Sequence, residues 1–444
     1  MGEWLDEYEK LVVRMNTPRV AVDNAACAAA TLVQVDSSAR DRGVLLDAVR
    51  ALADLGLSVT KAYISSPDGR WFMDAFHVTD RRGRKLPDDG VAACVQRALG
   101  GPAHPAAGEA EPEGLLTALE LTGADRAGLL SEVFAVLADL RCGVVKARAW
   151  AHRGRLACVV FLRGDDADAD AERVPRILAR LGHLVRGDGE APAGAVAAVP
   201  AVSVAHADRR LHQLMAADLG RCRQGRAAFP APDVSVQSWA ERGYSVVAVQ
   251  CRDRPKLLFD VVCTLHDMGY VVFHGTVGTA GGRARLEFYV RGADGSPIRS
   301  EAEGDWLSQC LQAAIERRSL EGVRLELCTP DRPGLLSDVT RTFRENGLLV
   351  AQAEVSTKGD VASNVFYVTD AAGNAVDQSA IDAVRERVGT ECLLVMEEPR
   401  PQLYQKAVPG DRDYGGVGGG LGLVYLGNLV RRNLYNLGLI KSCS

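Results

Sequence analysis

The clearest pattern of apolar and polar positions runs from residue 325 to residue 396. A short apolar run meets a turn, Asp331-Arg332-Pro333-Gly334, and apolar residues then follow at positions 335, 336, 339 and 343. That spacing places them on one face of a helix, and Gly347 stands where a helix-closing glycine is expected. The predicted elements are a strand at 325–328, a helix from 335, strands at 348–355 and 365–368, a helix at 379–388 and a strand at 392–396.

This βαββαβ order is that of a split-βαβ, ferredoxin-like unit of about seventy residues. Similar patterns come into register on the residue that opens the first helix, which is Gly334 here and Gly43, Gly128 or Lys256 elsewhere. The sequence therefore predicts an α+β chain of four ferredoxin-like repeats arranged as pairs. The predicted repeats span residues 31–99, 115–186, 243–320 and 322–398.

The segments between the repeats have a different composition. Residues 1–30 are predicted to hold a docking helix and a strand, and residues 100–114 and 187–200 are rich in Ala, Gly and Pro, which is typical of linkers. The region 187–242 is expected to be a linker with a short helix at 208–218. Residues 399–444 form a Gly-rich tail whose spacing of leucines from residue 423 onward fits an amphipathic segment for a partner, a membrane surface or the protein's own domains.

A repeat of this size needs a neighbour. A domain of about seventy residues buries only about 60% of its unfolded surface, and an open sheet leaves two edges uncovered. Because almost no linker separates the last two repeats, the chain is expected to divide two by two. We expect repeats to associate side by side or face to face, with their first helices near a shared seam where a small ligand would contact two repeats.

Composition limits the class of protein. The formal charge of −5 over 444 residues gives no reason to expect nucleic acid as a partner. The eleven cysteines form no C-x-x-C pair and lie in apolar runs, which indicates a reducing compartment. No apolar run reaches the length of a transmembrane segment. The expected location is cytoplasmic, nuclear or both.

The candidate chemistry lies in the turns before two of the first helices. Unpaired N–H groups and the macrodipole at a helix N-terminus favour a carboxylate, a glycine leaves room for a ligand to reach them, and a nearby aspartate suits an ammonium group. The same residues also make an ordinary helix start without any ligand, and both interpretations stay open. The candidate ligand-binding residues are Asp125, Arg126, Gly128, Leu129, Asp331, Arg332, Gly334 and Leu335.

The other two repeats depart from this pattern. Lys256 replaces the glycine of the third repeat, where it would fill the space of a carboxylate or bind one, and Asp41 lies one place late in the first. The second and fourth repeats are therefore the predicted binding repeats. We expect Gly334→Val to abolish binding while leaving the fold mostly intact.

Segments 121–132, 329–338 and 209–215, together with residues 7–12 and 16–20, resemble the plant ACT-domain-repeat proteins over nearly the whole chain. The resemblance implies four ACT domains, which bind free amino acids at domain interfaces, and a regulatory role without a cofactor. The ACT segments are also similar to those of bacterial uridylyltransferase/uridylyl-removing enzymes, which makes glutamine the first ligand to test.

Catalytic alternatives have little support. Asp166, Asp168 and Asp170 lack the glycine and distal glutamate of an EF-hand, and His266-Asp267 lacks a second His-rich partner. No P-loop, H-E-x-x-H or G-x-S-x-G motif is present. Two hypotheses remain: a non-catalytic amino-acid sensor that acts on an unknown protein partner, or an ACT-fold scaffold without ligand binding. Either could form homo-oligomers through its sheets.

Overall fold

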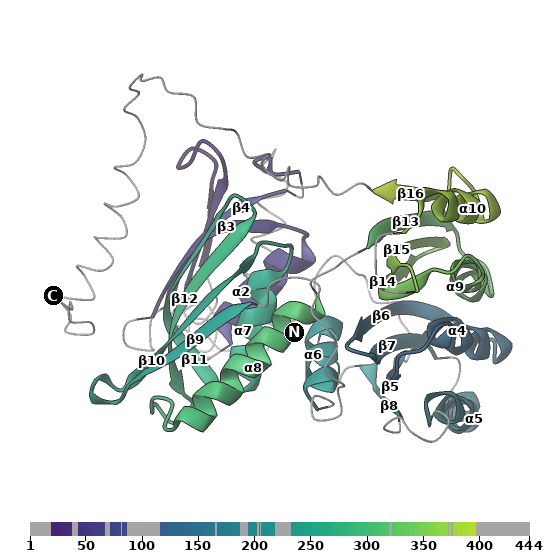
Figure 1. Cartoon of the computed structure of the whole chain (residues 1–444), viewed down its shortest axis with the longest axis horizontal. Coiled ribbons are helices and arrows are strands. Elements are labelled where there is room, and N and C mark those ends of the chain that lie inside the picture. Colours follow the sequence, from purple (N-terminus) through teal and green to yellow (C-terminus); the bar gives the residue numbers. More distant parts are fainter. Residues whose placement is uncertain are drawn as a thin grey trace, which may run out of the picture. The chain divides into compact units, whose positions relative to one another are not determined.

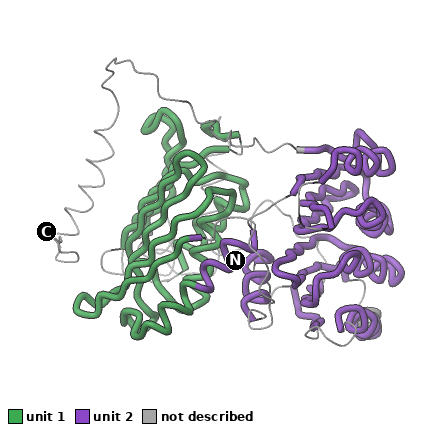
Figure 2. The backbone as a smooth tube through the Cα atoms, in the orientation of Figure 1, with its two compact units in different colours: residues 1–103, 233–308, 400–444 green, residues 104–232, 309–399 purple. Residues whose placement is uncertain are grey.

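The structure is a computed structural model that describes residues 19–37, 43–66, 72–80, 82–86, 116–164, 167–186, 194–201, 204, 206–217, 232–318, 322–371, 373 and 376–396. The chain forms two compact units (Figure 2). Unit 1 comprises residues 1–103, 233–308 and 400–444, and unit 2 comprises residues 104–232 and 309–399. The predicted N-terminal helix, the loop around Asp41 and the C-terminal tail lie outside the described residues.

Unit 1 is built on an eight-stranded sheet with the order β1-β2-β4-β3-β11-β12-β10-β9 (Figure 1). Its strands are β1 (Arg19–Asp23), β2 (Thr31–Ser37), β3 (Ser58–Ser65), β4 (Phe72–Thr79), β9 (Asp233–Trp239), β10 (Tyr244–Arg252), β11 (Tyr270–Ala280) and β12 (Arg283–Gly292). Its helices are α2 (Val44–Asp54), α7 (Leu257–Asp267) and the first part of α8 (Glu301–Arg317), with a 3₁₀ turn, η3 (Ala240–Arg242), between β9 and β10.

Unit 2 repeats this design in a second eight-stranded sheet, β16-β13-β15-β14-β6-β7-β5-β8. Its strands are β5 (Leu116–Ala124), β6 (Val144–His152), β7 (Arg155–Arg163), β8 (Ala195–Pro200), β13 (Val323–Pro330), β14 (Leu349–Lys358), β15 (Val361–Thr369) and β16 (Leu393–Met396). Its helices are α4 (Leu129–Asp139), α5 (Ala167–Arg186), α6 (Ala207–Ala217), α9 (Leu335–Glu345) and α10 (Gln378–Val388).

Each sheet joins two halves that are distant in sequence. β3 pairs with β11, placing Ile64 opposite Gly275, and β14 pairs with β6, placing Ala353 opposite Ala149. The first predicted repeat is thus joined to the third, and the second to the fourth, so the chain does not divide into its sequential halves. The side-by-side pairing itself is confirmed, and it removes one open edge from each half.

The outermost strand of each half differs between the units. In unit 2 it follows the second helix, as in βαββαβ: β8 pairs with β5, and β16 with β13. In unit 1 it comes first instead, since β1 precedes β2 and β9 precedes β10. In the described part of unit 1, the edge strand of each ferredoxin-like half therefore precedes the half instead of following its second helix. β8 and β9 both lie in the stretch predicted to be a linker. The alanine-rich sequence of β8 and the partly exposed residues of β9 give only a weak apolar signal, so the sequence does not predict these strands.

The first helices meet in pairs over one face of each sheet. α2 packs against α7 in unit 1, and α4 against α9 in unit 2 (Figure 1). The helical spacing predicted for α9 is confirmed, since Leu335, Val339 and Phe343 are buried in the core. Side chains of α4 and α9 belong to one continuous cluster, so the two halves of unit 2 share a core.

The opposite face of the unit 2 sheet is covered by α6 (Figure 1). Leu211 and Met215 of this helix pack with Trp150 and Phe161 in a second, separate apolar cluster. Among the described residues, no helix has the length and apolar character needed to cross a lipid bilayer.

Candidate ligand-binding seams

Three similar loops lead into the first helices of the halves. We call residues 125–128 loop two, 253–256 loop three and 331–334 loop four. The opening N–H of each loop donates to a hairpin turn of the same half: Asp125 to the Gly154 carbonyl at 2.9 Å, Asp253 to Gly282 at 2.9 Å and Asp331 to Asp360 at 2.7 Å. Each aspartate therefore has a fixed backbone position beside a helix start.

The glycines of loops two and four are required by the backbone. Gly128 and Gly334 lie at φ 87° and 82°, in the left-handed region, and Lys256 adopts φ 61° at the same place in loop three. A β-branched residue is strained there. Our expectation that Gly334→Val leaves the fold mostly intact is therefore wrong, because valine would disturb the helix start as well as any ligand.

The loop arginines have partners on their own helices. Arg126 donates to Glu132 at 2.9 Å, Arg254 lies 2.7 Å from Asp260, and Arg332 lies 2.7 Å from Asp338. Arg126 and Arg332, both predicted to bind ligand, thus hold their loops against the first helical turn. The hydrogen bond from Arg126, with the nearby charges of Arg126 and Arg344, lowers the pKa of Glu132 against the opposing effect of burial.

The predicted leucines lie under the loops. Leu129 and Leu335 are buried in the core, and their N–H groups donate to the carbonyls of Arg126 and Arg332, each at 3.1 Å. Each leucine therefore fixes the base of its loop, with its side chain turned to the core.

Two of the loop aspartates have shifted pKa values. Asp125 is exposed as a residue, yet desolvation of its carboxyl group raises the pKa. Desolvation also raises the pKa of Asp253, against the effects of the Arg254 N–H and the Thr279 hydroxyl. A ligand ammonium group placed beside either carboxyl would favour the ionised form.

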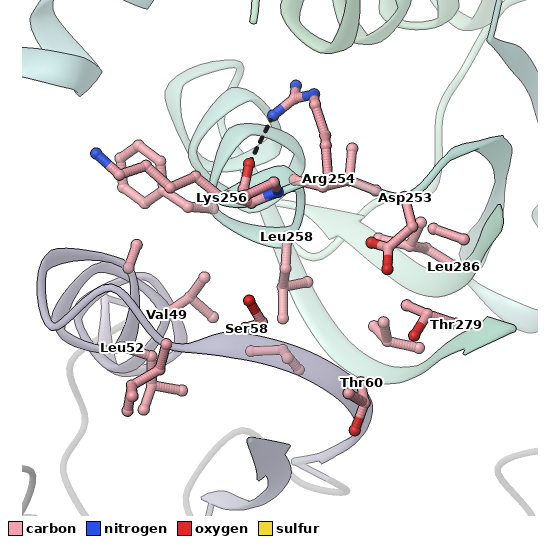
Figure 3. Close-up of a pocket in the computed structure, with 18 residues that line it drawn as sticks. Val49, Leu52, Ser58, Thr60, Asp253, Arg254, Lys256, Leu258, Thr279 and Leu286 are labelled. Carbon is pink, nitrogen blue, oxygen red and sulfur yellow. Dashed lines mark hydrogen bonds between the residues drawn. The ribbon is translucent and has the colours of Figure 1, made fainter. Parts of the chain in front are cut away.

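Unit 1 has a cavity of about 260 Å³ where α7 and loop three meet α2 and the start of β3 (Figure 3). We call it the α2–α7 seam. Oxygen atoms of Ser58, Thr60, Asp253 and Thr279 lie around this space, whereas the guanidinium of Arg254 points away from it (Figure 3). The apolar part of the lining is Val49, Leu52, Ala53, Leu57, Val59, Pro255, Leu257, Leu258, Phe259, Val277, Ala284 and Leu286.

The corresponding place in unit 2, the α4–α9 seam, has a cavity of only about 30 Å³. Its lining includes three of the predicted residues, Asp125, Arg126 and Gly128. The side chain of Arg344 lies over Gly128, so that a Cβ added to the glycine would be 2.6 Å from the arginine Cδ. Around Gly334, by contrast, an added Cβ would have no neighbour within 4 Å.

The residues that line the larger cavity lie outside the two loops predicted to bind a ligand. In the sequence, loop three has Lys256 where loops two and four have glycine, and Ser58, Thr60 and Thr279 belong to no recognisable motif. The available signal was Ala53, a small residue at a helix position where α9 has Arg344. Only the pairing of α2 with α7 shows that Ala53 lies beside loop three.

The paired ferredoxin-like halves, with their first helices side by side over a shared sheet, are matched by models of the ACT-domain class. A model of the "ACR family N-terminal ACT domain" matches residues 26–104, and ACT domain models match residues 117–185 and 323–388. The chain belongs to the ACR family of ACT domain-containing proteins.

Two relatives from Arabidopsis thaliana show how far the likeness extends. The chain is 54% identical to "ACT domain-containing protein ACR8" over 449 residues, which cover 100% of both chains. It is 46% identical to "ACT domain-containing protein ACR4" over 454 residues, covering 99% of this chain and 98% of that protein. A "Bifunctional uridylyltransferase/uridylyl-removing enzyme" from Novosphingobium aromaticivorans is 25% identical over 189 residues, 35% of this chain and 21% of the enzyme.

Family membership and the ACT domains point to a regulatory, amino-acid-binding role rather than to catalysis. The described side chains contain no group of three or more His, Cys, Asp or Glu placed to hold a metal ion. His266 and Asp267, considered above for metal chemistry, are the last two residues of α7.

Proposed function

We propose that this chain is a non-catalytic sensor of a free amino acid, which binds in the seams between paired ACT domains. The observation that carries the proposal is the α2–α7 cavity, where an acidic loop residue, Asp253, lies beside apolar walls and the start of a helix. Such a combination suits a small molecule with two charged ends and a short side chain.

Each end of an amino acid has a matching group in this seam. The carboxylate would lie at the first turn of α7, where N–H groups and the macrodipole favour an anion, with Lys256 adding a positive charge. The ammonium group would lie against Asp253, and the side chain against Leu258, Val277 and Leu286.

For the α4–α9 seam the proposal retains the residues predicted from sequence. Asp125 and Asp331 would receive the ammonium group, and the helix starts at Gly128-Leu129 and Gly334-Leu335 would receive the carboxylate. Arg126 and Arg332 would act by holding the loops, because each already has a carboxylate partner.

Regulation requires that the ligand bind one arrangement of the paired domains better than another. A ligand that contacts both α2 and α7 favours arrangements in which these helices keep their spacing. A protein partner, or a second copy paired through the sheets, would respond to that shift. We propose this action in the cytoplasm, the nucleus or both. Glutamine is the first ligand to test, because part of this chain is similar to a bacterial uridylyltransferase/uridylyl-removing enzyme.

Thermal unfolding of the whole chain with each common amino acid tests the proposal. A ligand at about a hundred times its Kd should stabilise the protein by about 2.7 kcal/mol. The α-amide and the N-acetyl derivative of the responding amino acid are matched controls, because each removes one charged end. If no amino acid shifts the melting curve, the ACT-fold scaffold without ligand is the better account.

A further inference from the structure

Ala53 and Arg344 occupy the same position in their repeats. α2 and α9 are both eleven-residue helices, and each of these residues is the last but one. Gly56 and Gly347 follow three positions later, both with positive φ. The two residues therefore meet the loop of the paired half in equivalent places, Ala53 facing loop three and Arg344 facing loop two.

The two seams differ where these residues lie. With Ala53, the α2–α7 cavity is about 260 Å³, whereas with Arg344 the α4–α9 cavity is about 30 Å³, room for one or two water molecules. Arg344 lies directly over Gly128, in the space a ligand would need to reach the start of α4.

The side chain of Arg344 is held loosely. The residue is exposed, and within the described residues its guanidinium makes no hydrogen bond or ion pair. Its charge lies near Glu132, whose pKa it helps to lower. An exposed arginine attracted only through solvent-screened charge can move aside at small cost.

We propose that this helix position decides which seam is open: Ala53 leaves the α2–α7 seam open to a small zwitterion, and Arg344 closes the α4–α9 seam as a built-in plug. The identity of the ligand rests on the function proposed above, but the opening and closing of the seams does not. Two ACT-domain pairs in one chain would then serve different roles, one binding and one closed until Arg344 is displaced.

Chemical labelling tests the difference without any ligand. Ser58 and Leu349 are matched positions, each two residues after its glycine and each lining its cavity. Ser58→Cys and Leu349→Cys would be introduced separately into the full chain and treated with methyl methanethiosulfonate. Peptide mass spectrometry separates the new cysteine from the native ones.

We expect Ser58→Cys to react about tenfold faster than Leu349→Cys, or more, since reaction requires an open path to the sulfur. Adding Arg344→Ala should raise the rate at Leu349→Cys about tenfold, while Arg344→Lys, which keeps length and charge, should leave it low. Ala53→Arg should slow Ser58→Cys by a similar factor. Equal rates at the two sites, or no response to Arg344→Ala, would overturn the proposal.

Ala53 is buried, so Ala53→Arg can fail to fold. Arg344→Ala removes an exposed side chain and keeps the test decisive. A calorimetric titration with glutamine addresses the ligand separately, and Arg344→Ala is expected to bind one more equivalent than the native chain. If labelling follows the pattern above but no amino acid binds, the proposed function fails and the assignment of an open and a closed seam stands. If an amino acid binds but both cysteines react at the same rate, the proposed function stands and the seam assignment fails.

Discussion

The guanidinium of Arg254 lies 2.7 Å from the carboxylate of Asp260, whose side chain is 0% exposed. The equivalent pair in loop four, Arg332 with Asp338, has the same 2.7 Å separation but lies at the surface, with side chains 56% and 39% exposed. The two ion pairs have the same separation but differ in burial, so comparing them isolates the effect of burial.

Asp260→Asn should destabilise unit 1 by about 3–5 kcal/mol, because it takes the carboxylate partner from a cation that is only 11% exposed. Asp338→Asn should cost at most about 1 kcal/mol, since an exposed pair contributes little. Hydrogen exchange in α7 and α9 under increasing urea measures each unit separately. Equal losses in the two variants would contradict this account of burial.

Gly334→Ala should destabilise unit 2 by about 1–2 kcal/mol, because a Cβ at φ 82° is strained even though the space around it is empty. Gly304→Ala in α8 is the control. Its Cβ would meet Val236 at an ordinary 3.6 Å, and alanine should stabilise the helix by about 0.5–1 kcal/mol. Opposite shifts in the denaturation midpoints are expected; a gain in both would show that loop four has no backbone constraint.

The buried carboxyl group of Asp74 should make the stability of unit 1 depend on pH. Its carboxyl is buried in β4, and burial raises the pKa from 3.8 to about 7. Below pH 3.8 both folded and unfolded states are protonated, and no penalty arises. Between pH 4 and 7 only the unfolded state loses its proton, so the stability contributed by this group falls as pH rises, by on the order of 4 kcal/mol in total.

Asp74→Asn should remove that dependence. Asn364 already occupies a similar position in unit 2. Its Oδ1 accepts a hydrogen bond from the Ser356 N–H at 3.3 Å, much as Asp74 accepts one from the Ser65 N–H at 3.4 Å. Melting temperatures of native and variant chains at pH 5 and pH 8 are the measurement. The variant should gain stability mainly at pH 8, and an equal gain at both values would count against an ionising Asp74.

Leu211→Ala should lower the free energy of unfolding of unit 2 by about 2–5 kcal/mol, since this side chain is fully buried between α6 and the sheet face that α6 covers. Leu214→Ala, at a partly buried position of the same helix, should cost less. Amide exchange in β6 and β7 should rise with Leu211→Ala. Unchanged exchange would mean that α6 contributes little to unit 2.

The sequence was sufficient for features that depend on nearby residues. The spacing of Leu335, Val339 and Phe343 specifies α9, and the glycine-closed helix recurs in α2 and α7 because the local pattern recurs. In α4 the closing position is Arg141, which adopts φ 53° without being glycine.

Features that depend on distant residues could not be derived in the same way. The pairing of β3 with β11 joins strands separated by more than two hundred positions, and no local pattern distinguishes it from pairing with β6. The glycines of loops two and four were the reason to predict binding there. In the structure, these glycines are accounted for by the positive φ of the backbone before each helix. The cavities depend on Ala53 and Arg344, each lying against a loop of the other half of its sheet.

The most direct test of the central claim is a calorimetric titration of the full-length chain with each common amino acid, glutamine first. The account predicts saturable heat for at least one of them, lost when Asp253→Ala removes the carboxyl at the α2–α7 seam and kept when Asp382→Ala removes an exposed carboxyl on α10. Absence of binding by every amino acid, or binding indifferent to Asp253→Ala, would contradict it.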